Sequence, residues 1–332
     1  LIKNYLLNSL HLCTLFLMKI LLADKNHEIL EEILVENKFE IDKFWNLSAD
    51  ELINILPNYD GIVIRSKFKL TKEILSVCPK LKVIGRVGAG MENIDVEFAK
   101  SKNILCLSAP QGNRNAVGEH ALGMLLMLMN NLKKADAEVR DGIWLRAENR
   151  GFELEGKTVA IIGYGQMGTS FAEKLGGFNC NIIACDKYKQ NFGTDKVKEV
   201  TIETIYNEAD IVSLHLPLTE ETNYYADVSF FNAFKKPIYF INTARGKCLN
   251  TKALVNALIE NKVLGACLDV LEYESISFEK INFETLPDDF KYLLSSNKVI
   301  LTPHIAGWTH ESNYKMSKII ADDIVKIFTN LK

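Results

Sequence analysis

Short apolar runs alternate with helix-length amphipathic segments along almost the whole chain, and this alternation restricts the possible folds more than any other sequence feature. In the first third, runs rich in β-branched residues occur at 20–23, 40–44, 61–65, 83–86 and 104–107. Apolar residues at helical spacing fill the segments between them, at 28–36, 49–56, 72–77 and 94–100. Strict alternation of strands and helices predicts a parallel sheet with helices on both faces.

A longer helix is expected next, from about Ala116 to Asp141 and ending near Gly142. Its part from Ala121 to Met129 is almost continuously apolar, so we expect it to be buried on most sides. Such a helix can be a core helix between two domains, or it can also contribute to a dimer interface.

A second alternating series starts at Lys157. It contains six apolar runs, at 158–162, 181–185, 211–214, 238–241, 265–268 and 299–301. Six strands match a complete doubly wound dinucleotide-binding domain. A final helix is expected from about His310 to Lys332, and we expect it to pack back on the first domain. The fold class predicted is α/β, with two doubly wound parallel-sheet domains.

The first strand of the second series runs directly into a glycine-rich loop, with the letters GYGQMG at 163–168. Alone this pattern is weak, but between a buried strand and a helix it has the context that dinucleotide binding requires. Gly163 permits a tight turn, Gly165 lets the backbone approach a pyrophosphate, and Gly168 lets helix and strand pack closely. The helix N-terminus would supply free N–H donors to the phosphates.

The next predicted strand is followed by an acidic residue, Asp186. A carboxylate there can accept hydrogen bonds from the ribose hydroxyls of adenosine and would repel a 2′-phosphate. This predicts NAD rather than NADP as cofactor, although Lys187 and Lys189 lie nearby.

Three charged residues follow later predicted strands, at the edge where ligands of open α/β sheets bind. They are Arg245, Glu274 and His304. Oxidation of a hydroxy acid needs a base for the hydroxyl proton, a cation for the carboxylate and carbonyl oxygen, and a group that orients the base. A histidine, an arginine and a glutamate meet these three needs.

Taken together, these motifs resemble the D-isomer-specific 2-hydroxyacid dehydrogenase family, over nearly all of the chain from Met18 to Lys332. The matching segments are GYGQMG at 163–168, HLPLT at 215–219, NTARG at 242–246, LDVLEYE at 268–274 and TPHIAG at 302–307. The resemblance implies an NAD-binding Rossmann domain, residues 116–307, inserted into a flavodoxin-like substrate domain. That second domain would comprise residues 18–115 and 308–332.

The family's catalytic roles carry over by position. The resemblance implies that Arg245 binds the substrate carboxylate and carbonyl oxygen, and that His304 is the acid/base. Glu274 would hold His304 and favour its protonated form. Glu272 lies in the same stretch, but the spacing from Asp269 favours Glu274.

Cofactor contacts are implied by the same resemblance, with Asp269 facing the nicotinamide carboxamide and His215 shaping the cofactor pocket. The expected set is Gly163, Gly165, Gln166, Met167, Gly168, Asp186, His215, Leu216, Pro217, Thr222, Thr243, Ala244, Asp269 and Gly307. Histidines outside the motifs, among them His120, are expected to be structural.

The substrate carboxylate is expected on the loop with Gly88, Ala89 and Gly90, which resembles the family loop whose backbone N–H groups hold it. Glycines leave such donors bare, as in other anion-binding nests. Asn113 matches the segment that leads into the long helix. The arginine often found within that segment is Asn115 here, which removes one expected anion contact.

Arg65, Ser66 and Arg86 come at the ends of two predicted strands. Arg65 and Arg86 resemble the positions that phosphoglycerate dehydrogenases of this family use near the substrate phosphate, and guanidinium groups suit phosphate well. The alternative is that both arginines form ion pairs across the seam between the domains.

Charge and cysteine usage argue against other classes of protein. The 39 basic and 42 acidic residues leave a net charge of −3, and no Lys/Arg block suggests a nucleic-acid partner. The seven cysteines are scattered, so neither a disulfide framework nor a metal site is expected. We expect a cytoplasmic protein without membrane association and, from the resemblance, a homodimer.

Both ends of the chain and one loop depart from the family pattern. Residues 1–17 are apolar with one lysine, yet they lead without a cleavage site into Met18, so we expect a non-functional extension. The segment 275–298 is longer and more acidic than usual, and Ser275 stands where the family often has proline. The chain stops after its last predicted helix, so a C-terminal regulatory domain is not expected.

The function expected is NAD-dependent oxidation of a D-2-hydroxy acid to the 2-keto acid. The most specific expectation is oxidation of D-3-phosphoglycerate to 3-phosphohydroxypyruvate in serine biosynthesis. Glyoxylate/hydroxypyruvate reductase or D-lactate dehydrogenase activity is an alternative within the family. A non-catalytic NAD(H)-sensing binding protein is an alternative of another class, against which the presence of Arg245, Glu274 and His304 argues.

Overall fold

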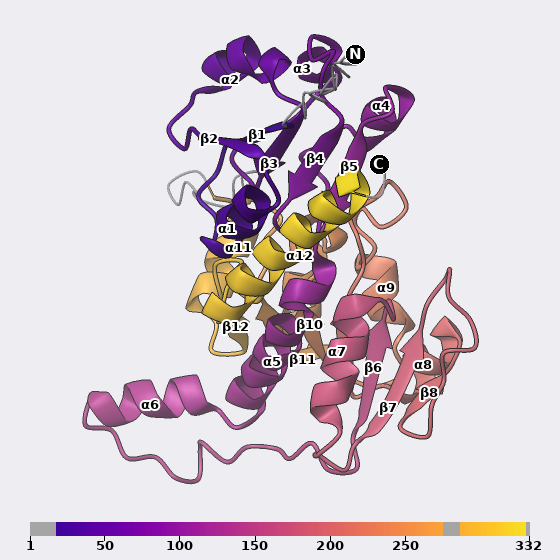
Figure 1. Ribbon diagram of the computed structural model, residues 1–332. Coiled ribbons are helices and arrows are strands. Elements are labelled where there is room, and N and C mark those ends of the chain that lie inside the picture. Colours follow the sequence, from indigo (N-terminus) through magenta and orange to yellow (C-terminus); the bar gives the residue numbers. More distant parts are fainter. Residues whose placement is uncertain (1–17, 275–285, 330–332) are drawn as a thin grey trace, which may run out of the picture.

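The computed structural model describes residues 18–274 and 286–329, which form two parallel α/β sheets with helices between and around them (Figure 1). The extension expected at 1–17 lies outside these residues, as does the first part of the segment 275–298. The predicted α/β class with two parallel-sheet units is confirmed. No helix within the described ranges is long and apolar enough to cross a membrane.

The first sheet has five parallel strands in the order β2-β1-β3-β4-β5, which is the flavodoxin-like order. Its strands are β1 (Lys19–Leu22), β2 (Glu40–Lys43), β3 (Gly61–Ile64), β4 (Val83–Arg86) and β5 (Leu105–Ser108). The connecting helices are α1 (Ile29–Glu36), α2 (Ala49–Ile55), α3 (Lys72–Ser76) and α4 (Val96–Ser101). All four residues of β3 are buried, because helices cover both faces of a parallel sheet.

The second sheet has seven parallel strands in the order β12-β11-β10-β9-β6-β7-β8. They are β6 (Thr158–Ile162), β7 (Asn181–Cys185), β8 (Val197–Glu199), β9 (Ile211–Leu214), β10 (Ile238–Asn242), β11 (Val263–Leu268) and β12 (Val299–Leu301). The helices of this unit are α7 (Gln166–Leu175), α8 (Ile202–Glu208), α9 (Val228–Ala233), α10 (Thr251–Ile259) and α11 (Asp288–Ser295). The order is the Rossmann order with one strand added.

The prediction of six strands missed β8. This strand pairs only with β7, at the edge of the sheet, and consists of three residues, two of them charged. A short edge strand of this kind has no apolar run that sequence patterns can detect.

The prediction of one helix over residues 116–141 is wrong. The structure has two helices, α5 (Pro110–Met129) and α6 (Leu132–Arg140), separated at Asn130 and Asn131. Asn131 adopts a left-handed backbone with φ of 54°, and its side chain donates to the carbonyl of Arg150. Asparagine tolerates this conformation better than most residues, so the backbone preference of Asn131 explains the break between the two helices. As a result α6 extends away from the body of the molecule (Figure 1).

The C-terminal helix α12 (His310–Thr329) returns to the first sheet, as predicted. Its buried side chains Met316, Ile320 and Ile324 share one apolar cluster with Ile20 of β1. Gly85 of β4 permits this contact, because a Cβ there would lie 2.7 Å from Ile320 Cγ2. The chain therefore crosses between the two sheets twice, through α5 and before α12, and the carboxyl ends of both sheets border one cleft.

Close packing between α5 and α7 yields a stability prediction. At Gly118 of α5 a Cβ would lie 2.9 Å from the backbone oxygen of Ser170 in α7, whereas at Gly123 of the same helix it would meet nothing within 4 Å. We expect Gly118→Ala to lower the free energy of unfolding by roughly 1–3 kcal/mol through overpacking. Gly123→Ala, the matched control, should be neutral or stabilising by up to about 1 kcal/mol. Urea denaturation measures both, and equal effects would contradict this packing.

Candidate active site

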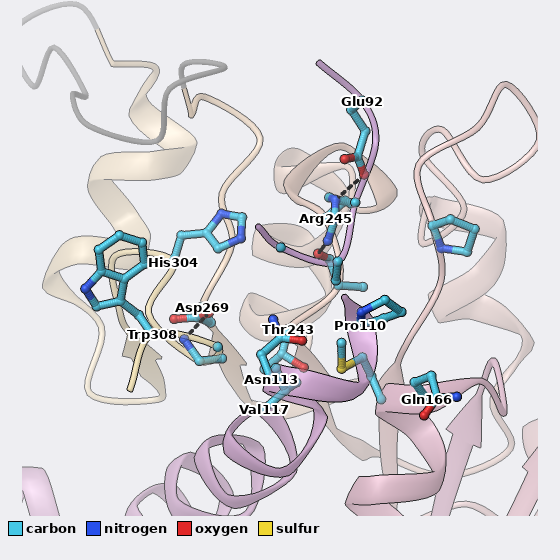
Figure 2. A pocket seen from close by; sticks show the side chains of 18 of the residues that line it. Glu92, Pro110, Asn113, Val117, Gln166, Thr243, Arg245, Asp269, His304 and Trp308 are labelled. Atoms are coloured by element: carbon cyan, nitrogen blue, oxygen red, sulfur yellow. Dashed lines mark hydrogen bonds and ion pairs between the residues drawn. The ribbon is translucent and has the colours of Figure 1, made fainter. Parts of the chain in front are cut away.

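A cavity of about 840 Å³ lies between the carboxyl ends of the two sheets. Most of the residues predicted for the site line it: Arg65, Ser66, Arg86, Gly88, Ala89, Gly90, Asn113, Gly165, Gln166, Met167, His215, Leu216, Pro217, Thr243, Ala244, Arg245, Asp269, His304 and Gly307. Five predicted residues do not border this cavity: Gly163, Gly168, Asp186, Thr222 and Glu274. Figure 2 shows His304 and Trp308 along one side of it and Gln166 on the other.

The glycine-rich loop has the geometry that its glycines predict. Gly163 has φ of 92°, and a Cβ on Gly168 would lie 2.2 Å from the carbonyl oxygen of Gly163. A Cβ on Gly165 would meet nothing within 4 Å, so this residue faces open space at the cleft. Helix α7 begins directly after it without a side-chain cap, which leaves its first N–H groups available to an anion such as a pyrophosphate.

Asp186 is held by backbone N–H groups at the end of β7. Its two carboxylate oxygens accept from the N–H groups of Tyr164 (2.8 Å), Tyr188 (2.9 Å) and Lys189 (3.0 Å). The two nearby lysines also have partners, because Lys187 pairs with Glu221 and Lys189 donates to the carbonyl of Tyr164. Lys187 is therefore part of an ion pair, whereas the partner of Lys189 is an uncharged carbonyl. The ribose contact of Asp186 stays a prediction.

Four residues that line the cleft each have a buried polar side-chain atom without a hydrogen-bond partner within the described part of the chain. These atoms are Arg86 Nε, Asn113 Oδ1, His215 Nδ1 and Thr243 Oγ1. Buried polar atoms nearly always have a partner, so this set fits a polar ligand that completes it. Together with the open glycine loop, these atoms make the cleft suitable for a dinucleotide.

His215 is held neutral by its surroundings. Its Nε2 lies 2.9 Å from Ser213 Oγ, and burial lowers the pKa of the imidazole to about 3. Part of the residue borders the cleft, but Nδ1 itself is shielded from solvent, which disfavours the charged imidazole. A neutral His215 can offer one donor and one acceptor to its partners.

His304 and Glu274 lie in direct contact, with 2.7 Å between Nδ1 and Oε2. The other oxygen of Glu274 accepts from the backbone N–H of Leu271. Glu272 instead accepts from the Tyr224 hydroxyl and the Thr251 N–H, so its carboxylate is engaged away from the histidine. A carboxylate on Nδ1 fixes both the orientation and the tautomer of an imidazole.

The loop that carries His304 is anchored on Asp269, a role that the sequence analysis missed. Asp269 is buried, and its Oδ1 accepts from Thr302 Oγ1 (2.6 Å) and the Ile305 N–H (2.8 Å), while Oδ2 accepts from the Ala306 N–H (2.9 Å). The His304 N–H donates to the Asp269 carbonyl at 2.7 Å. Oδ2 can accept a second hydrogen bond, and its predicted contact with the nicotinamide carboxamide stays a prediction.

His120 of α5 contacts this anchor, so its structural role is to support the loop that carries His304. Its Nε2 lies 3.0 Å from Thr302 Oγ1 and 3.5 Å from Asp269 Oδ1. Because the Thr302 hydroxyl gives its hydrogen to Asp269, His120 must supply the hydrogen for its own contact. The sequence carried no signal for this partnership, since the two residues lie 182 positions apart.

Arg245, the cation predicted for the site, forms an ion pair with Glu92 in a loop of the opposite sheet. Arg245 Nε donates to Glu92 Oε1 at 2.5 Å, and Nη1 donates to the Ala244 carbonyl at 2.7 Å (Figure 2). Burial alone would raise the pKa of Glu92, but the charge and hydrogen bond of Arg245 hold it below its usual value. Glu92 stands directly after the predicted carboxylate loop, yet the sequence analysis gave it no role.

Arg65 and Arg86 form no ion pair among the described residues, so the alternative of cross-seam pairs for them is not supported. Burial, with repulsion from Arg245, lowers the pKa of Arg86 to about 10, and its buried Nε has no partner within the described ranges. A Cβ at Gly88 would lie 1.1 Å from Arg86 Nη1, and one at Gly90 2.2 Å from Arg245 Nη2. The glycines of this loop therefore make room for two guanidinium groups.

Comparison with known proteins gives the family. The model of the D-isomer specific 2-hydroxyacid dehydrogenase NAD binding domain matches residues 122–306, more than half of the chain. A hydroxypyruvate reductase of Thermotoga maritima is 35% identical over 88% of this chain and 93% of its own length. The chain belongs to the D-isomer specific 2-hydroxyacid dehydrogenases, a family of oxidoreductases, and it contains their NAD-binding domain.

Other similar proteins are named for different substrates, and some are longer than this chain. A D-3-phosphoglycerate dehydrogenase of Archaeoglobus fulgidus is 34% identical over 95% of this chain but only 58% of its own length. The chain thus spans less than two thirds of that relative. The solved structure of a D-lactate dehydrogenase from Aquifex aeolicus, in complex with NAD and lactic acid, is 28% identical. It superposes with a TM-score of 0.81 over 94% of this chain and 95% of that one.

The buried imidazole of His215 predicts a pH dependence of stability. Its pKa is about 3 in the folded protein and near 6.5 when unfolded, so between these values the unfolded state binds more protons. Stability should therefore fall as the pH drops below 6.5, by up to about 1.4 kcal/mol per pH unit from this group. His215→Asn should remove that part of the slope. Urea denaturation of the cofactor-free protein between pH 7 and 5 measures it, and identical slopes would contradict a neutral His215.

Proposed function

We propose that this chain oxidises a D-2-hydroxy acid to the corresponding 2-keto acid with NAD, and catalyses the reverse reduction. The contact between His304 Nδ1 and Glu274 Oε2, 2.7 Å long and placed beside the cleft, carries this proposal. An imidazole held by a carboxylate is suited to acid/base catalysis, because its other nitrogen can exchange a proton with the substrate. Arg245 supplies the cation that a carboxylate substrate needs.

In the mechanism that follows, the substrate carboxylate binds between Arg245 and the loop at Gly90. The N–H groups of Ala89 and Gly90 donate to no acceptor within the described part of the chain, so they are available to it. His304 takes the hydroxyl proton through Nε2, while Glu274 stabilises the imidazolium that forms. NAD, held at the glycine-rich loop, would supply the acceptor for the hydride of the hydroxyl-bearing carbon. Arg245 stabilises the negative charge that the substrate oxygen carries as its proton moves to His304.

The substrate that we propose is D-3-phosphoglycerate, which would assign the reaction to serine biosynthesis. Three guanidinium groups, of Arg65, Arg86 and Arg245, face the cleft. Of the two carboxylates that line it, Glu92 pairs with Arg245, and Asp269 is buried and engaged by the His304 loop. A substrate with a single carboxylate would engage Arg245 and leave the other two arginines without an anion. Arginine binds phosphate oxygens with several donors at once, so a phosphate at the far end of the acid fits this excess of positive charge.

Reduction of an unphosphorylated acid such as hydroxypyruvate is a second candidate. It is favoured by the Thermotoga maritima relative, a hydroxypyruvate reductase, 93% of whose length this chain covers. The two candidates share the mechanism and differ only in what Arg65 and Arg86 bind.

Steady-state kinetics on an acid panel test the proposal. We expect NADH formation with D-3-phosphoglycerate to exceed that with D-glycerate and D-lactate. Arg86→Gln should lower kcat/KM for the phosphorylated acid roughly 10- to 100-fold, the loss of a charged hydrogen bond. Lys82→Ala is the matched control, because this exposed lysine precedes β4 whereas Arg86 ends it. It should leave kcat/KM unchanged.

Two other outcomes would overturn parts of the proposal. Preference for an unphosphorylated acid would keep the reaction and reject the substrate. Tight NADH binding with no turnover of any acid would reject the enzyme and support an NAD(H)-sensing protein. If the protein oxidises an unphosphorylated acid, His304→Asn should abolish that turnover while retaining NADH binding.

We further propose that the protein is a homodimer through the arm formed by α6 and the residues after it. No side chain of α6 is buried, although the arm carries large apolar residues. Its exposed apolar side chains are Leu132, Val139, Ile143, Trp144 and Leu145. An apolar surface of this kind on a projecting element is typical of an interface, and twofold dimers are the commonest assembly.

Sedimentation equilibrium tests the dimer. We expect Trp144→Glu to shift the wild-type dimer towards monomer, because the charge would have to be buried at the interface. Val35→Glu is the matched control, since Val35 is an exposed apolar residue on α1 outside the arm. A monomeric wild-type protein at micromolar concentration would reject this assembly.

A further inference from the structure

Trp308 lines the cleft directly after the loop that carries His304, and the sequence analysis gave it no role. The Arg65 guanidinium carbon lies over its indole ring, 4.1 Å from the ring centroid. The residue is nevertheless 65% exposed, so it is not a core residue that happens to touch an arginine. Its large apolar surface beside a functional cleft calls for an explanation.

The backbone on both sides of this contact is fixed. The Trp308 N–H donates to the Ile305 carbonyl at 2.9 Å, within the loop anchored by Asp269. On the other side, the Arg65 N–H donates to the partly buried Asp24 carboxylate at 2.5 Å, and the Arg65 carbonyl accepts from Asn93 Nδ2 at 3.2 Å. The contact between Trp308 and Arg65 therefore joins two backbone segments that hydrogen bonds hold in place, one on each side of the cleft.

Stacking leaves the donors of Arg65 usable. A guanidinium group on an aromatic face keeps its N–H bonds in its own plane, so they point past the ring rather than into it. Among residues 18–274 and 286–329 its side chain makes one hydrogen bond, which is long, 3.4 Å from Nη1 to the Lys25 carbonyl. Arg245 differs, because its Nε and Nη1 are already engaged by Glu92 and Ala244.

We propose that Trp308 is a specificity-determining residue, which holds the Arg65 guanidinium in place for a second anionic group at the far end of the hydroxy acid. Only three residues separate Trp308 from His304, so the distance between the base and this second anion site is set within one anchored loop. The inference rests on the proposed oxidation of a hydroxy acid in this cleft. A phosphate monoester and a second carboxylate share the required chemistry.

Kinetics with acids of both kinds test the proposal. We expect Trp308→Ala to raise KM for D-3-phosphoglycerate, or for D-2-hydroxyglutarate if the second group is a carboxylate, roughly 5- to 20-fold with little change in kcat. KM for D-lactate and D-glycerate should not change. Trp308→Phe should retain most of the wild-type KM because it keeps an aromatic face. Trp45→Ala is the matched control, since Trp45 also contacts a cation, Lys43, but does not line the cleft.

A double-mutant cycle separates the stack from independent effects. Once Arg65→Ala has removed the guanidinium, Trp308→Ala should add almost nothing to the increase in KM. Additive effects, or an equal rise in KM for acids with and without a second anion, would overturn the proposal. So would unchanged KM values for every acid in Trp308→Ala.

If the wild-type protein oxidises none of these acids, that outcome rejects the proposed function alone. Tryptophan fluorescence then still tests the second anion site. The chain has three tryptophans, so the variant Trp45→Phe with Trp144→Phe reports on Trp308 only. Titration with D-3-phosphoglycerate, D-2-hydroxyglutarate or inorganic phosphate should change its emission, and Arg65→Ala should abolish the change. No response to any of these anions would reject the second anion site.

Discussion

The buried carboxylate of Asp269 is the interaction on which the site depends. A buried charge is costly unless hydrogen bonds satisfy it, and here a hydroxyl and two backbone N–H groups of one loop do so. The same bonds fix the loop strongly enough for His304 to hold a left-handed backbone, with φ of 56°. In that conformation its imidazole reaches Glu274, which lies in the loop after the neighbouring strand β11. The acid/base pair is thus a consequence of a buried anchor.

The cleft has a second support, which joins the two sheets. Arg245 lies in the loop after β10 of the Rossmann sheet and Glu92 in a loop of the first sheet, and their ion pair joins the two sides of the cavity. Glu92 also offsets part of the repulsion among three clustered guanidinium groups. The remaining positive charge favours an anionic ligand in the cleft, because Coulomb interactions are stronger in a partly enclosed site than at an open surface.

The two halves of the cleft divide the chemistry between them. The Rossmann half offers the open glycine loop and the unpartnered atoms of His215 and Thr243, which suit a dinucleotide. The other half offers arginines and bare N–H groups, which suit a small acid. Trp308 lies where the chain passes from one half to the other, so it can relate the position of the acid to that of His304.

The sequence by itself determined the two parallel sheets, the glycine loop and the residue types that we propose for catalysis, because each appears as a short local motif or pattern. Apolar runs report strands covered on both faces, and glycines report tight local turns. Only the tertiary structure decided that Asp269 anchors the His304 loop, that Glu92 engages Arg245, and that Arg65 stacks on Trp308. These partners lie far apart in sequence, and their pairing depends on how helices and sheets pack, which no local pattern records.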